Sequence, residues 1–421
     1  MDTGDTAWIL ASSALVLLMT PGLAFFYGGM VRSKTVLNMM MMSFSALAII
    51  PVLWVLYGYT MAFGPDGSSL LGGFGKAGLD GVGQGSLSGT IPEYVFVGFQ
   101  LMFAIITVAL ISGAIADRAK FSAWLVFVVV WVTVVYFPVA HWVFDFGDNG
   151  GWIATKLEAI DFAGGTAVHI NAGAAGLALA LVLGKRVGWR RDPMRPHNLP
   201  FVLLGAGLLW FGWFGFNAGS AVGANGLAGL AFVNTAVATG AAIIGWIAVE
   251  YVREGKGTSL GAASGAVAGL VAITPAAGAV SPVGSIVLGI IAGALCALAV
   301  GLKYKLGYDD SLDVVGVHLV GGLVGTVLIG VLATKGNTGG IGSLFYGGDV
   351  TQLGKQIVAA VAVLAYSFVL TYVIGKLIDM TIGFRVSEED EVTGIDQVEH
   401  LETAYDYAGS SAGGSNLLKE L

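Results

Sequence analysis

Long unbroken apolar stretches dominate the chain, and most charged residues fall between them. Eleven of these runs are about 20 residues or longer, which is enough for a helix to cross the roughly 30 Å of hydrocarbon in a bilayer. Strands of a membrane barrel would need only about ten residues each, so the lengths favour helices. The runs cover residues 7–30, 36–63, 94–116, 121–144, 160–183, 199–221, 227–251, 258–278, 283–302, 313–333 and 356–383. The sequence therefore predicts an all-α integral membrane protein with eleven transmembrane helices.

Two further regions complete the predicted organisation. The 64–92 segment is rich in glycine and serine and carries no run of charge, so it is predicted to be a loop. After the last apolar run the composition becomes acidic. Residues 384–421 are therefore predicted to form a tail outside the lipid, following a transmembrane domain of residues 1–383. The last residues of this tail, rich in glycine and serine, are expected to lack order.

Lysine and arginine are distributed unevenly between alternate loops. One set of loops holds thirteen of them: Arg32, Lys34, Arg118, Lys120, Lys185, Arg186, Arg190, Arg191, Arg195, Arg253, Lys256, Lys303 and Lys305. The other set holds four: Lys76, Lys156, Lys335 and Lys355. Because loops on the cytoplasmic side carry the excess of basic residues, the N-terminus is predicted to lie outside and the C-terminus in the cytoplasm. An odd number of spans agrees with this orientation.

Composition supports the membrane assignment and limits other classes. The chain is 56% hydrophobic and 11% charged, whereas a soluble domain is about one quarter charged. Its 65 glycines suit helices that approach closely in lipid. The single cysteine, Cys296, excludes an intrachain disulfide. The net charge of −7 gives no reason to expect a nucleic-acid partner.

A short motif occurs twice. Val168-His169-Ile170, followed by Gly173 and Gly176, returns as Val317-His318-Leu319, followed by Gly322 and Gly325. The copies fall in the fifth and tenth predicted helices. A unit of five helices crosses the membrane an odd number of times, so a second unit begins on the opposite side. We therefore predict two inverted repeats, about 7–183 and 199–333, plus one extra C-terminal helix at 356–383, with His169 facing His318 across the repeat axis.

Two facing imidazoles allow three interpretations. They can pass a proton or hydrogen-bond a small polar solute, since each neutral ring has one donor and one acceptor. They can form a hydrogen bond that merely joins two helices, or they can ligate haem or another metal. No cluster of Cys, Asp or Glu with metal-ligand spacing accompanies them, and no nucleophile–base pair indicates an enzyme. We therefore predict no cofactor and no enzymatic activity.

Aromatic residues gather toward the predicted outer ends of several helices. Phe99 and Phe103 are four residues apart, and so are Phe216 and Ser220, so each pair shares a helix face. The outer end of the fourth helix carries a further set: Trp142, Phe144, Phe146 and Trp152. Aromatic faces beside a hydroxyl suit a small cation. The alternative for each residue alone is a place in the core or in the interfacial aromatic belt.

Two ionisable residues lie near these aromatic residues. Asp161 begins the fifth predicted run, where a carboxylate can cap the first turn of a helix. We expect this structural role for Asp161, with an electrostatic attraction for cations as a second effect. His141, near the outer end of the fourth run, is expected to reach the membrane interface.

With these motifs the chain resembles the ammonium transporter family, the Amt/Mep/Rh superfamily, in its prokaryotic branch. The resemblance extends from about residue 7 to 405. Its motifs are Phe25-Phe26-Tyr27-Gly28-Gly29, Asp161-Phe162-Ala163-Gly164-Gly165, Gly184-Lys185-Arg186, Pro196-His197-Asn198-Leu199-Pro200, Gly212 to Ser220, Thr274-Pro275-Ala276, Asp313 to His318, and the tail residues Arg385-Val386, Glu388-Glu389, Gly394-Ile395-Asp396 and Ala404-Tyr405.

The resemblance implies a homotrimer in the cell membrane with one pore per subunit. Carried over by motif, the implied site residues are the twin pore histidines His169 and His318, the stacked phenylalanines Phe103 and Phe216 that close the external mouth, the external hydroxyl of Ser220, the supporting Asp161, and the pore-associated Trp213 and Thr274.

One position departs from the family pattern. The external cation–π residue is usually a tryptophan at the end of the fourth helix, and the matching position here is Phe144. Phenylalanine is a weaker cation–π partner than tryptophan. The resemblance therefore implies either weaker external binding or substitution by Trp142 or Trp152.

The function implied by the resemblance is transport of ammonium, or of methylammonium as its analogue. The cation would be recognised outside, lose a proton, and cross as ammonia past the histidines, with or without co-transfer of the proton. A PII-type regulatory protein is an implied partner at the cytoplasmic face. Two other hypotheses stay open: an ammonium sensor with the same fold, and a bis-histidine haem protein.

Overall fold

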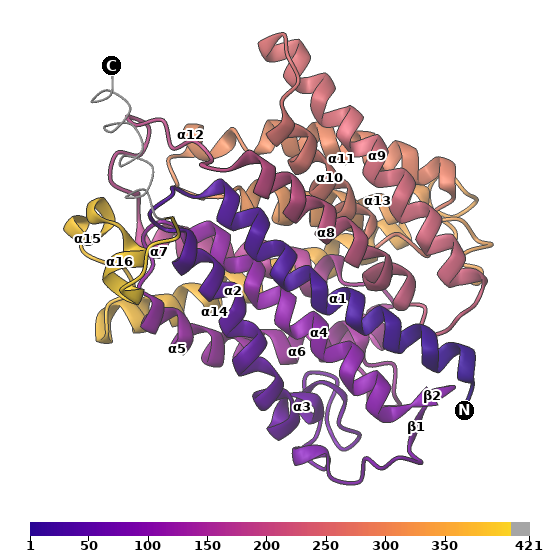
Figure 1. The fold of residues 1–421 in the computed structure, drawn as a ribbon. Helices are drawn as coiled ribbons and strands as arrows, with labels where there is room; N and C mark the ends of the chain where they lie inside the picture. Colours follow the sequence, from indigo (N-terminus) through magenta and orange to yellow (C-terminus); the bar gives the residue numbers. More distant parts are fainter. Residues whose placement is uncertain (406–421) are drawn as a thin grey trace, which may run out of the picture.

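The computed structural model describes residues 1–405. The expectation that the last residues of the chain lack order concerns residues outside this described part. Within it the chain is a bundle of long, tilted helices, with short helices and a two-stranded sheet at the ends of the bundle (Figure 1).

The first five predicted runs correspond to helices that are partly interrupted by π-helical or 3₁₀ turns. The elements of this half are α1 (Thr3–Met30); α2 (Val36–Leu53), η1 (Trp54–Gly58) and α3 (Tyr59–Phe63); η2 (Ala77–Leu79); β1 (Leu87–Ser88) and β2 (Ile91–Pro92); α4 (Glu93–Ile111) and η3 (Ser112–Ile115); α5 (Phe121–Trp131), η4 (Val132–Tyr136) and α6 (Phe137–Phe144); η5 (Ile153–Leu157); and η6 (Gly165–Ile170) with α7 (Asn171–Leu183).

The second half follows a similar order. Its elements are α8 (Leu199–Gly219), α9 (Gly226–Glu254), α10 (Ser259–Ile273), α11 (Pro282–Ala299), α12 (Leu302–Leu306), η7 (Val315–Leu319) with α13 (Val320–Leu332), α14 (Thr351–Thr381), α15 (Glu388–Thr393) and α16 (Ile395–His400). Ten helices of the described residues are long and apolar enough to cross a membrane, and α10 is a shorter apolar helix. The chain is thus a helical, multi-pass membrane protein.

Two predicted boundaries were wrong. The fifth run was expected to be helical from residue 160, but η6 begins at Gly165 because Gly164 has a φ of 117°, outside the helical region. The eighth run was expected to stay helical to residue 278, but α10 ends at Ile273. Turns follow through residue 279, and Pro275 in them has no N–H with which to extend a helical ladder.

Small residues allow the helices to lie in close contact. A Cβ atom on Gly205 of α8 would lie 2.3 Å from the backbone nitrogen of Phe26 in α1. A Cβ atom on Gly293 of α11 would lie 2.0 Å from the carbonyl oxygen of Ala242 in α9. Both distances are far below a van der Waals contact, so these two helix pairs need glycine at these positions. Figure 1 shows α1 beside α8 and α9 beside α11.

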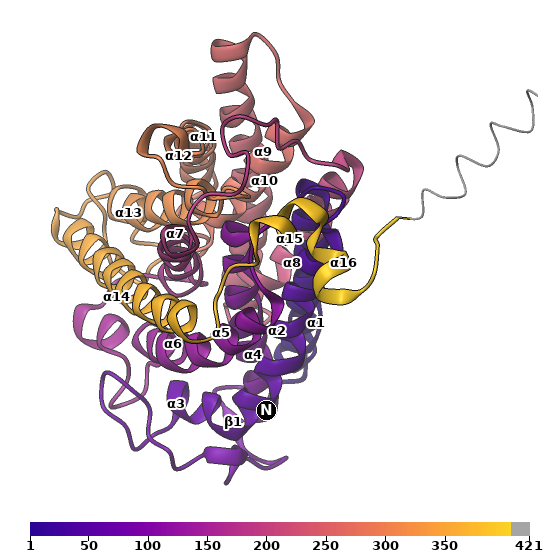
Figure 2. The same ribbon diagram turned by 90° about the vertical axis from the view of Figure 1, so that its left-hand side faces the viewer.

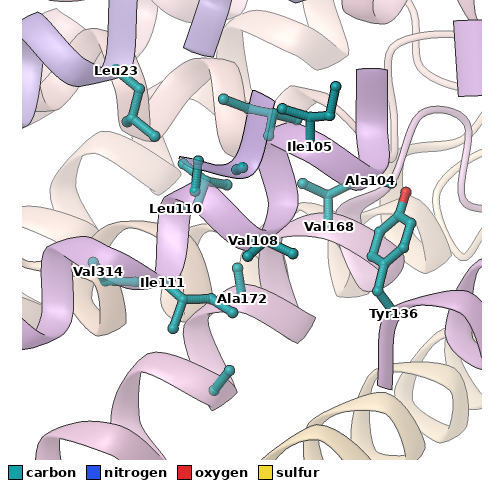
Figure 3. Close-up of a cluster of buried hydrophobic side chains, with 14 of the residues drawn as sticks. Leu23, Ala104, Ile105, Val108, Leu110, Ile111, Tyr136, Val168, Ala172 and Val314 are labelled. Carbon is teal, nitrogen blue, oxygen red and sulfur yellow. The ribbon is translucent and has the colours of Figure 1, made fainter. Parts of the chain in front are cut away.

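The buried apolar core joins the two halves of the chain. Side chains of α1, α4 and the η6–α7 segment meet Val314, which directly precedes η7 (Figure 3). Labelled members of this cluster include Leu23, Ala104, Ile105, Val108, Ile111, Tyr136, Val168 and Ala172. On the outside of the bundle α14 packs against α7 and α13. At one end the short helices α15 and α16 lie beside the start of α2 (Figure 2).

Candidate functional site

The two histidines of the repeated motif meet inside the bundle. Their Nδ1 atoms are 3.3 Å apart, and the rings are nearly parallel, with centroids 5.4 Å apart. Both side chains are buried. One ring therefore donates a hydrogen bond to the other through Nδ1. Nε2 of His169 is also buried and has no hydrogen-bond partner among residues 1–405, so an imidazole nitrogen remains for a small polar solute.

Each histidine lies in a π-helical segment at the start of its helix. His169 is in η6 and His318 is in η7. An aspartate eight residues earlier accepts hydrogen bonds from the first backbone N–H groups of each segment. Asp161 accepts from Gly164 and Gly165 (2.8 and 2.7 Å) and also from the backbone N–H and the hydroxyl of Thr166.

Asp310 has the same position in the second copy. Its carboxylate accepts from the backbone N–H groups of Val314 at 3.0 Å and Val315 at 2.7 Å. This relation is visible in the sequence, because Asp161 precedes His169, and Asp310 precedes His318, by the same interval. Sequence reasoning nevertheless missed Asp310, since the charged stretch around it was interpreted only as part of a loop.

Two aromatic rings also stack on the His169 imidazole. Trp213 lies 5.4 Å and Phe216 lies 6.0 Å from the imidazole centroid, both within 23° of parallel. The indole of Trp213 donates to the hydroxyl of Thr274 at 2.8 Å, and that hydroxyl donates to the carbonyl of Leu270. The predicted pore residues Trp213 and Thr274 therefore form one hydrogen-bonded unit beside the histidine.

Phe103 and Phe216 separate the histidines from a large cavity. Their ring centroids are 4.4 Å apart, and the side chains are 1% and 0% exposed. Phe216 contacts His169 on one side, while Phe103 lines the cavity on the other. The two buried rings therefore lie next to each other, one lining the cavity and the other against His169.

The cavity beyond Phe103 has a volume of about 670 Å³, and we refer to it as the aromatic cavity. Its lining includes Ser220, whose hydroxyl donates to the carbonyl of Phe216 at 2.8 Å, and Phe144, whose ring lies 6.4 Å from that of Phe103. Asp161 also lines it. Burial raises the pKa of Asp161 above its usual value, although its hydrogen bonds oppose this shift. The structure thus brings four of the predicted external-site residues together.

Trp142, the other aromatic residue predicted for the external site, is not among the residues that line the aromatic cavity. Its indole donates to the carbonyl of Leu70 at 2.8 Å and packs against Tyr366 and Trp152, away from the residues that line the aromatic cavity. Trp142 and Phe144 are two residues apart on a helix, so their side chains point about 160° apart around the helix axis. Only Phe144 faces the cavity.

His141 does not reach the interface as expected. It is 1% exposed, and its ring nitrogens lie 2.8 Å from the carbonyl oxygen of Ala62 and 2.7 Å from that of Ser68. The carboxylate oxygen Oδ2 of Asp145 lies 3.3 Å from His141 Nδ1, the ring nitrogen that faces Ala62. His141 therefore fixes the start of the 64–92 loop to the end of α6.

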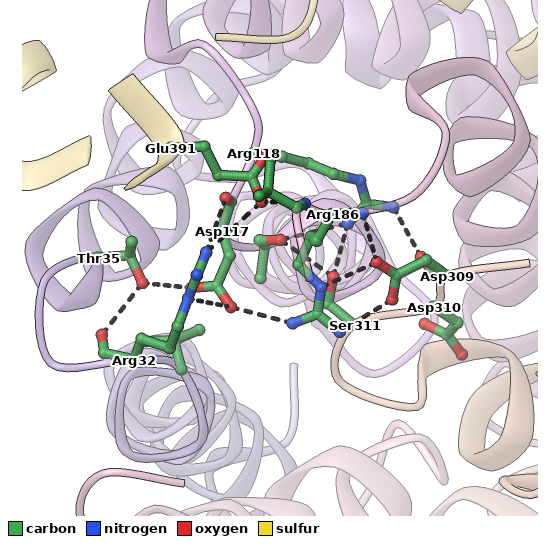
Figure 4. Close-up of polar contacts among 12 residues, drawn as sticks. Arg32, Thr35, Asp117, Arg118, Arg186, Asp309, Asp310, Ser311 and Glu391 are labelled. Atoms are coloured by element: carbon green, nitrogen blue, oxygen red, sulfur yellow. Dashed lines mark hydrogen bonds and ion pairs between the residues drawn. The ribbon is translucent and has the colours of Figure 1, made fainter. Parts of the chain in front are cut away.

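A network of buried ion pairs lies at the opposite end of the bundle, and we call it the ion-pair face (Figure 4). Arg186 contacts Asp309 at 2.8 Å and Asp117 at 2.9 Å. Burial alone would raise the pKa of Asp309, but hydrogen bonding to Arg186 and the charge of Arg118 hold it below its usual value. The Asp309 carboxylate is therefore charged.

The tail residue Glu391 completes this network. Its side chain is fully buried, and it contacts Arg385 at 2.8 Å and Arg32 at 3.7 Å. It also accepts a hydrogen bond from the backbone N–H of Val187 at 2.7 Å. The acidic composition of the tail indicated a segment outside the lipid, but these partners lie far away in sequence and were not predicted.

The two histidines do not have the geometry of a pair of axial haem ligands. Trans ligation through two iron–imidazole bonds of about 2 Å each would separate the ligating nitrogens by ~4 Å, more than the observed 3.3 Å. In the part of the chain that the structure describes, no group of three or more His, Cys, Asp or Glu side chains could hold a metal ion. The geometry therefore gives no support to the bis-histidine haem hypothesis.

Comparison with known proteins decides the family. Residues 7–405 match the model of the Ammonium Transporter Family. The chain belongs to the ammonium transporter family. An ammonium transporter of Mycobacterium bovis is 61% identical to it over 97% of this chain and 92% of its own length. The curated relatives are named ammonium transporters, so the chain belongs to a family of transporters and not of enzymes.

Solved structures of family members share this fold. The crystal structure of Candida albicans Mep2 matches with a TM-score of 0.84 and 36% identity, over 93% of this chain and 88% of Mep2. A structure titled "Sensor Amt Protein" matches with a TM-score of 0.88 and 28% identity, over 94% of this chain and 98% of that protein. The family thus includes a protein described as a sensor as well as transporters.

Proposed function

We propose that this ammonium transporter family member recognises ammonium in the aromatic cavity and conducts ammonia past His169 and His318. The observation that carries the proposal is the order of elements: a cavity, two stacked rings, and a buried histidine pair with a free nitrogen. Ser220, Phe103 and Phe144 surround the cation, which combines one hydroxyl with aromatic faces.

Asp161 acts on this cation through its charge. Its carboxylate oxygens are occupied by the N–H groups and hydroxyl at the start of η6, so direct contact with the cation is not its role. A carboxylate held at the floor of the cavity still attracts a cation electrostatically. The same hydrogen bonds fix η6 and thereby orient His169.

Passage beyond the rings favours the neutral species. An unpaired ion in an apolar passage is penalised by many kcal/mol, whereas a neutral amine is penalised far less. Ammonium therefore releases a proton before ammonia moves between Phe103 and Phe216. Ammonia then hydrogen-bonds to the imidazole nitrogens in turn. The proton either returns to the side of entry or follows through the histidine pair.

The arrangement in the membrane is also proposed. We infer eleven spans, with α10 as the eighth, and two inverted repeats of about 7–183 and 199–333 followed by α14. The matched aspartate–histidine intervals support the repeat. The aromatic cavity faces outward and the N-terminus is external, while the ion-pair face and the 384–421 tail are cytoplasmic, following a transmembrane domain of residues 1–383. The family supports a homotrimer in the cell membrane, with a PII-type protein as a partner of the cytoplasmic face.

Methylammonium uptake into proteoliposomes tests the transport function. We expect His169→Ala and His318→Ala to lower uptake more than about tenfold, because each removes one partner from the polar path. Wild-type uptake that equals empty liposomes would overturn the function. Full uptake by both variants, at wild-type melting temperature, would show that the histidines are structural. A current evoked by ammonium on a solid-supported membrane distinguishes co-transfer of the proton from neutral transport.

A sensor is the second candidate, and the similarity to the sensor protein favours it specifically. A sensor binds ammonium and changes the conformation of a partner-binding segment without appreciable flux. Stabilisation of the wild-type protein that grows with methylammonium concentration, combined with no uptake, would favour the sensor. Uptake that saturates near the Kd given by this stabilisation would favour the transporter.

A further inference from the structure

A second polar cluster lies in the wall of the aromatic cavity, apart from Ser220 and Phe144. Glu93, the first residue of α4, has a side chain that is only 8% exposed. Its Oε1 accepts hydrogen bonds from the hydroxyl of Tyr59 at 2.9 Å and from the ammonium group of Lys76. All three residues line the cavity.

The 64–92 loop holds Lys76 firmly in this place. The backbone N–H of Lys76 donates to the hydroxyl of Thr60 at 3.0 Å, and this hydroxyl donates to the carbonyl of Gly73 at 2.5 Å. Lys76 Nζ also lies 6.0 Å from the centroid of the Tyr59 ring, within the range of a cation–π contact. The lysine thus places a tethered primary ammonium group beside a carboxylate and an aromatic face.

These are the groups that a free ammonium ion would need. A carboxylate oxygen and the ring of Tyr59 supply charge and a π face, and Phe63 and Phe96 add apolar lining. A tethered group has an effective concentration that a free ion must exceed in order to replace it. The side chain of Lys76 therefore excludes a free cation while it stays in place.

We propose that Glu93 and Tyr59 form a second cation site in the aromatic cavity, specific for a small ammonium ion, and that Lys76 normally occupies it. The inference rests on the proposed transport function and deepens it. Lys76 neutralises the charge of Glu93, so the cavity attracts fewer cations than its carboxylates would otherwise bring. Lys76 is in this way a specificity-determining residue that weakens the apparent affinity for ammonium.

The test compares the concentration dependence of methylammonium uptake among matched variants. Lys76→Met vacates the site while Glu93 keeps its charge, and we expect KM to fall about three- to tenfold. Glu93→Gln leaves the lysine charge uncompensated, so KM should rise by a similar factor. The Lys76→Met/Glu93→Gln double variant should return close to wild type. Lys156→Met, which removes an exposed charge that is not part of the cavity lining, serves as the control and should leave KM unchanged.

A purely structural ion pair gives a different pattern. Both single variants would then lower the melting temperature without moving KM in opposite directions, and the double variant would not restore it. A KM for Lys76→Met equal to that of Lys156→Met overturns the inference. Lys76→Gln, which keeps a hydrogen-bond donor, provides a second charge-removing variant in case Lys76→Met does not fold.

A binding measurement separates this inference from the transport function. Methylammonium stabilises a protein that binds it by RT ln(1 + [L]/Kd), so the melting temperature rises with ligand concentration and no flux is needed. We expect the Kd fitted from this rise to be several-fold lower for Lys76→Met than for wild type, and the difference to vanish in the double variant. This result with no wild-type uptake would overturn transport alone. Equal Kd values for Lys76→Met and wild type would overturn the second site.

Discussion

The segments that carry His169 and His318 share one backbone arrangement but differ in what surrounds it. In both, an aspartate accepts hydrogen bonds from the first N–H groups of a π-helical segment. Asp161 opens onto the aromatic cavity. Asp310 instead lies near Lys303, whose ammonium donates to the Asp310 carbonyl at 2.9 Å and contacts Asp313 at 2.7 Å.

This difference separates two requirements. The local arrangement of aspartate and π turn sets the position of each histidine, and it is the same at both ends. The surroundings set the chemistry near each segment. Aromatic rings line the cavity beside Asp161, whereas charged side chains close to the ion-pair face surround Asp310. Substitution of either aspartate should therefore disturb the position of the histidine in its segment. Substitution of a residue around one aspartate should alter only the chemistry beside that segment.

The largest effect is expected from Asp161→Ala. It leaves three backbone N–H groups and the Thr166 hydroxyl without their acceptor, and each buried unsatisfied group costs about 1–3 kcal/mol. Asp310→Ala removes the acceptor of two N–H groups and should destabilise less. We expect Asp161→Ala to lower both melting temperature and methylammonium uptake more than Asp310→Ala. Equal, wild-type values for both variants would contradict the shared role of the two carboxylates.

Arg186→Met tests the ion-pair face. It leaves Asp309 and Asp117 buried without their arginine, and breaking a buried pair in this way costs about 3–5 kcal/mol. The matched change is Lys355→Met, which breaks an exposed pair with Glu158 and should have little effect. Thermal unfolding in detergent measures both. A melting temperature for Arg186→Met as high as that of Lys355→Met would show that the network contributes little.

The pH dependence of stability isolates Asp310. Burial and the charge of the neighbouring Asp313 together raise its pKa from 3.8 to about 6, although Lys303 opposes the shift. The folded protein therefore binds this proton more tightly than the unfolded chain. The contribution of Asp310 to stability should decline by about 2–3 kcal/mol as pH rises from roughly 4 to 6.

Asp310→Asn removes this titration and keeps a side-chain oxygen for the cap. We expect the melting temperature of wild type, relative to Asp310→Asn, to fall between pH 4 and pH 7. A constant difference across this range would mean that Asp310 does not change its protonation there.

The smallest effect is expected from Phe144→Trp, which changes only the aromatic end. Tryptophan is the stronger cation–π partner, and the gain of about 0.5–1 kcal/mol corresponds to a two- to fivefold lower KM for methylammonium. Phe144→Leu keeps the volume nearly unchanged without a ring and should raise KM. An unchanged KM in both variants would exclude Phe144 from cation recognition.

Much of the fold follows from hydrophobic runs, and the histidine pair follows from the repeated motif. The 36–63 run, for example, coincides with the helix from Val36 to Phe63. The direction of a side chain at a helix end was harder to predict. Trp142 and Phe144 are both aromatic and lie near the C-terminal end of α6. Because they are on opposite faces of this helix, only Phe144 of the two lines the cavity.

Long-range polar contacts were not predictable from local pattern. Lys76 and Glu93 lie in a loop and at a helix start, and their pairing depends on how the 64–92 segment folds over the cavity. Glu391 pairs with Arg32 across most of the chain. Charge indicates only that such residues need partners, whereas the packed helices decide which partners are within reach.

The cap of α2 has a consequence for the order in which the protein is made. Thr35 at the start of this helix gives no side-chain cap, and the backbone N–H groups of Leu37 and Asn38 instead donate to Asp396 at 3.0 and 2.8 Å. During synthesis the start of α2 leaves the ribosome long before its acceptor, which lies 359 residues after Leu37. The first turn of α2 is therefore completed only after Asp396 has been made, and a chain cut short before Asp396 retains an uncapped helix.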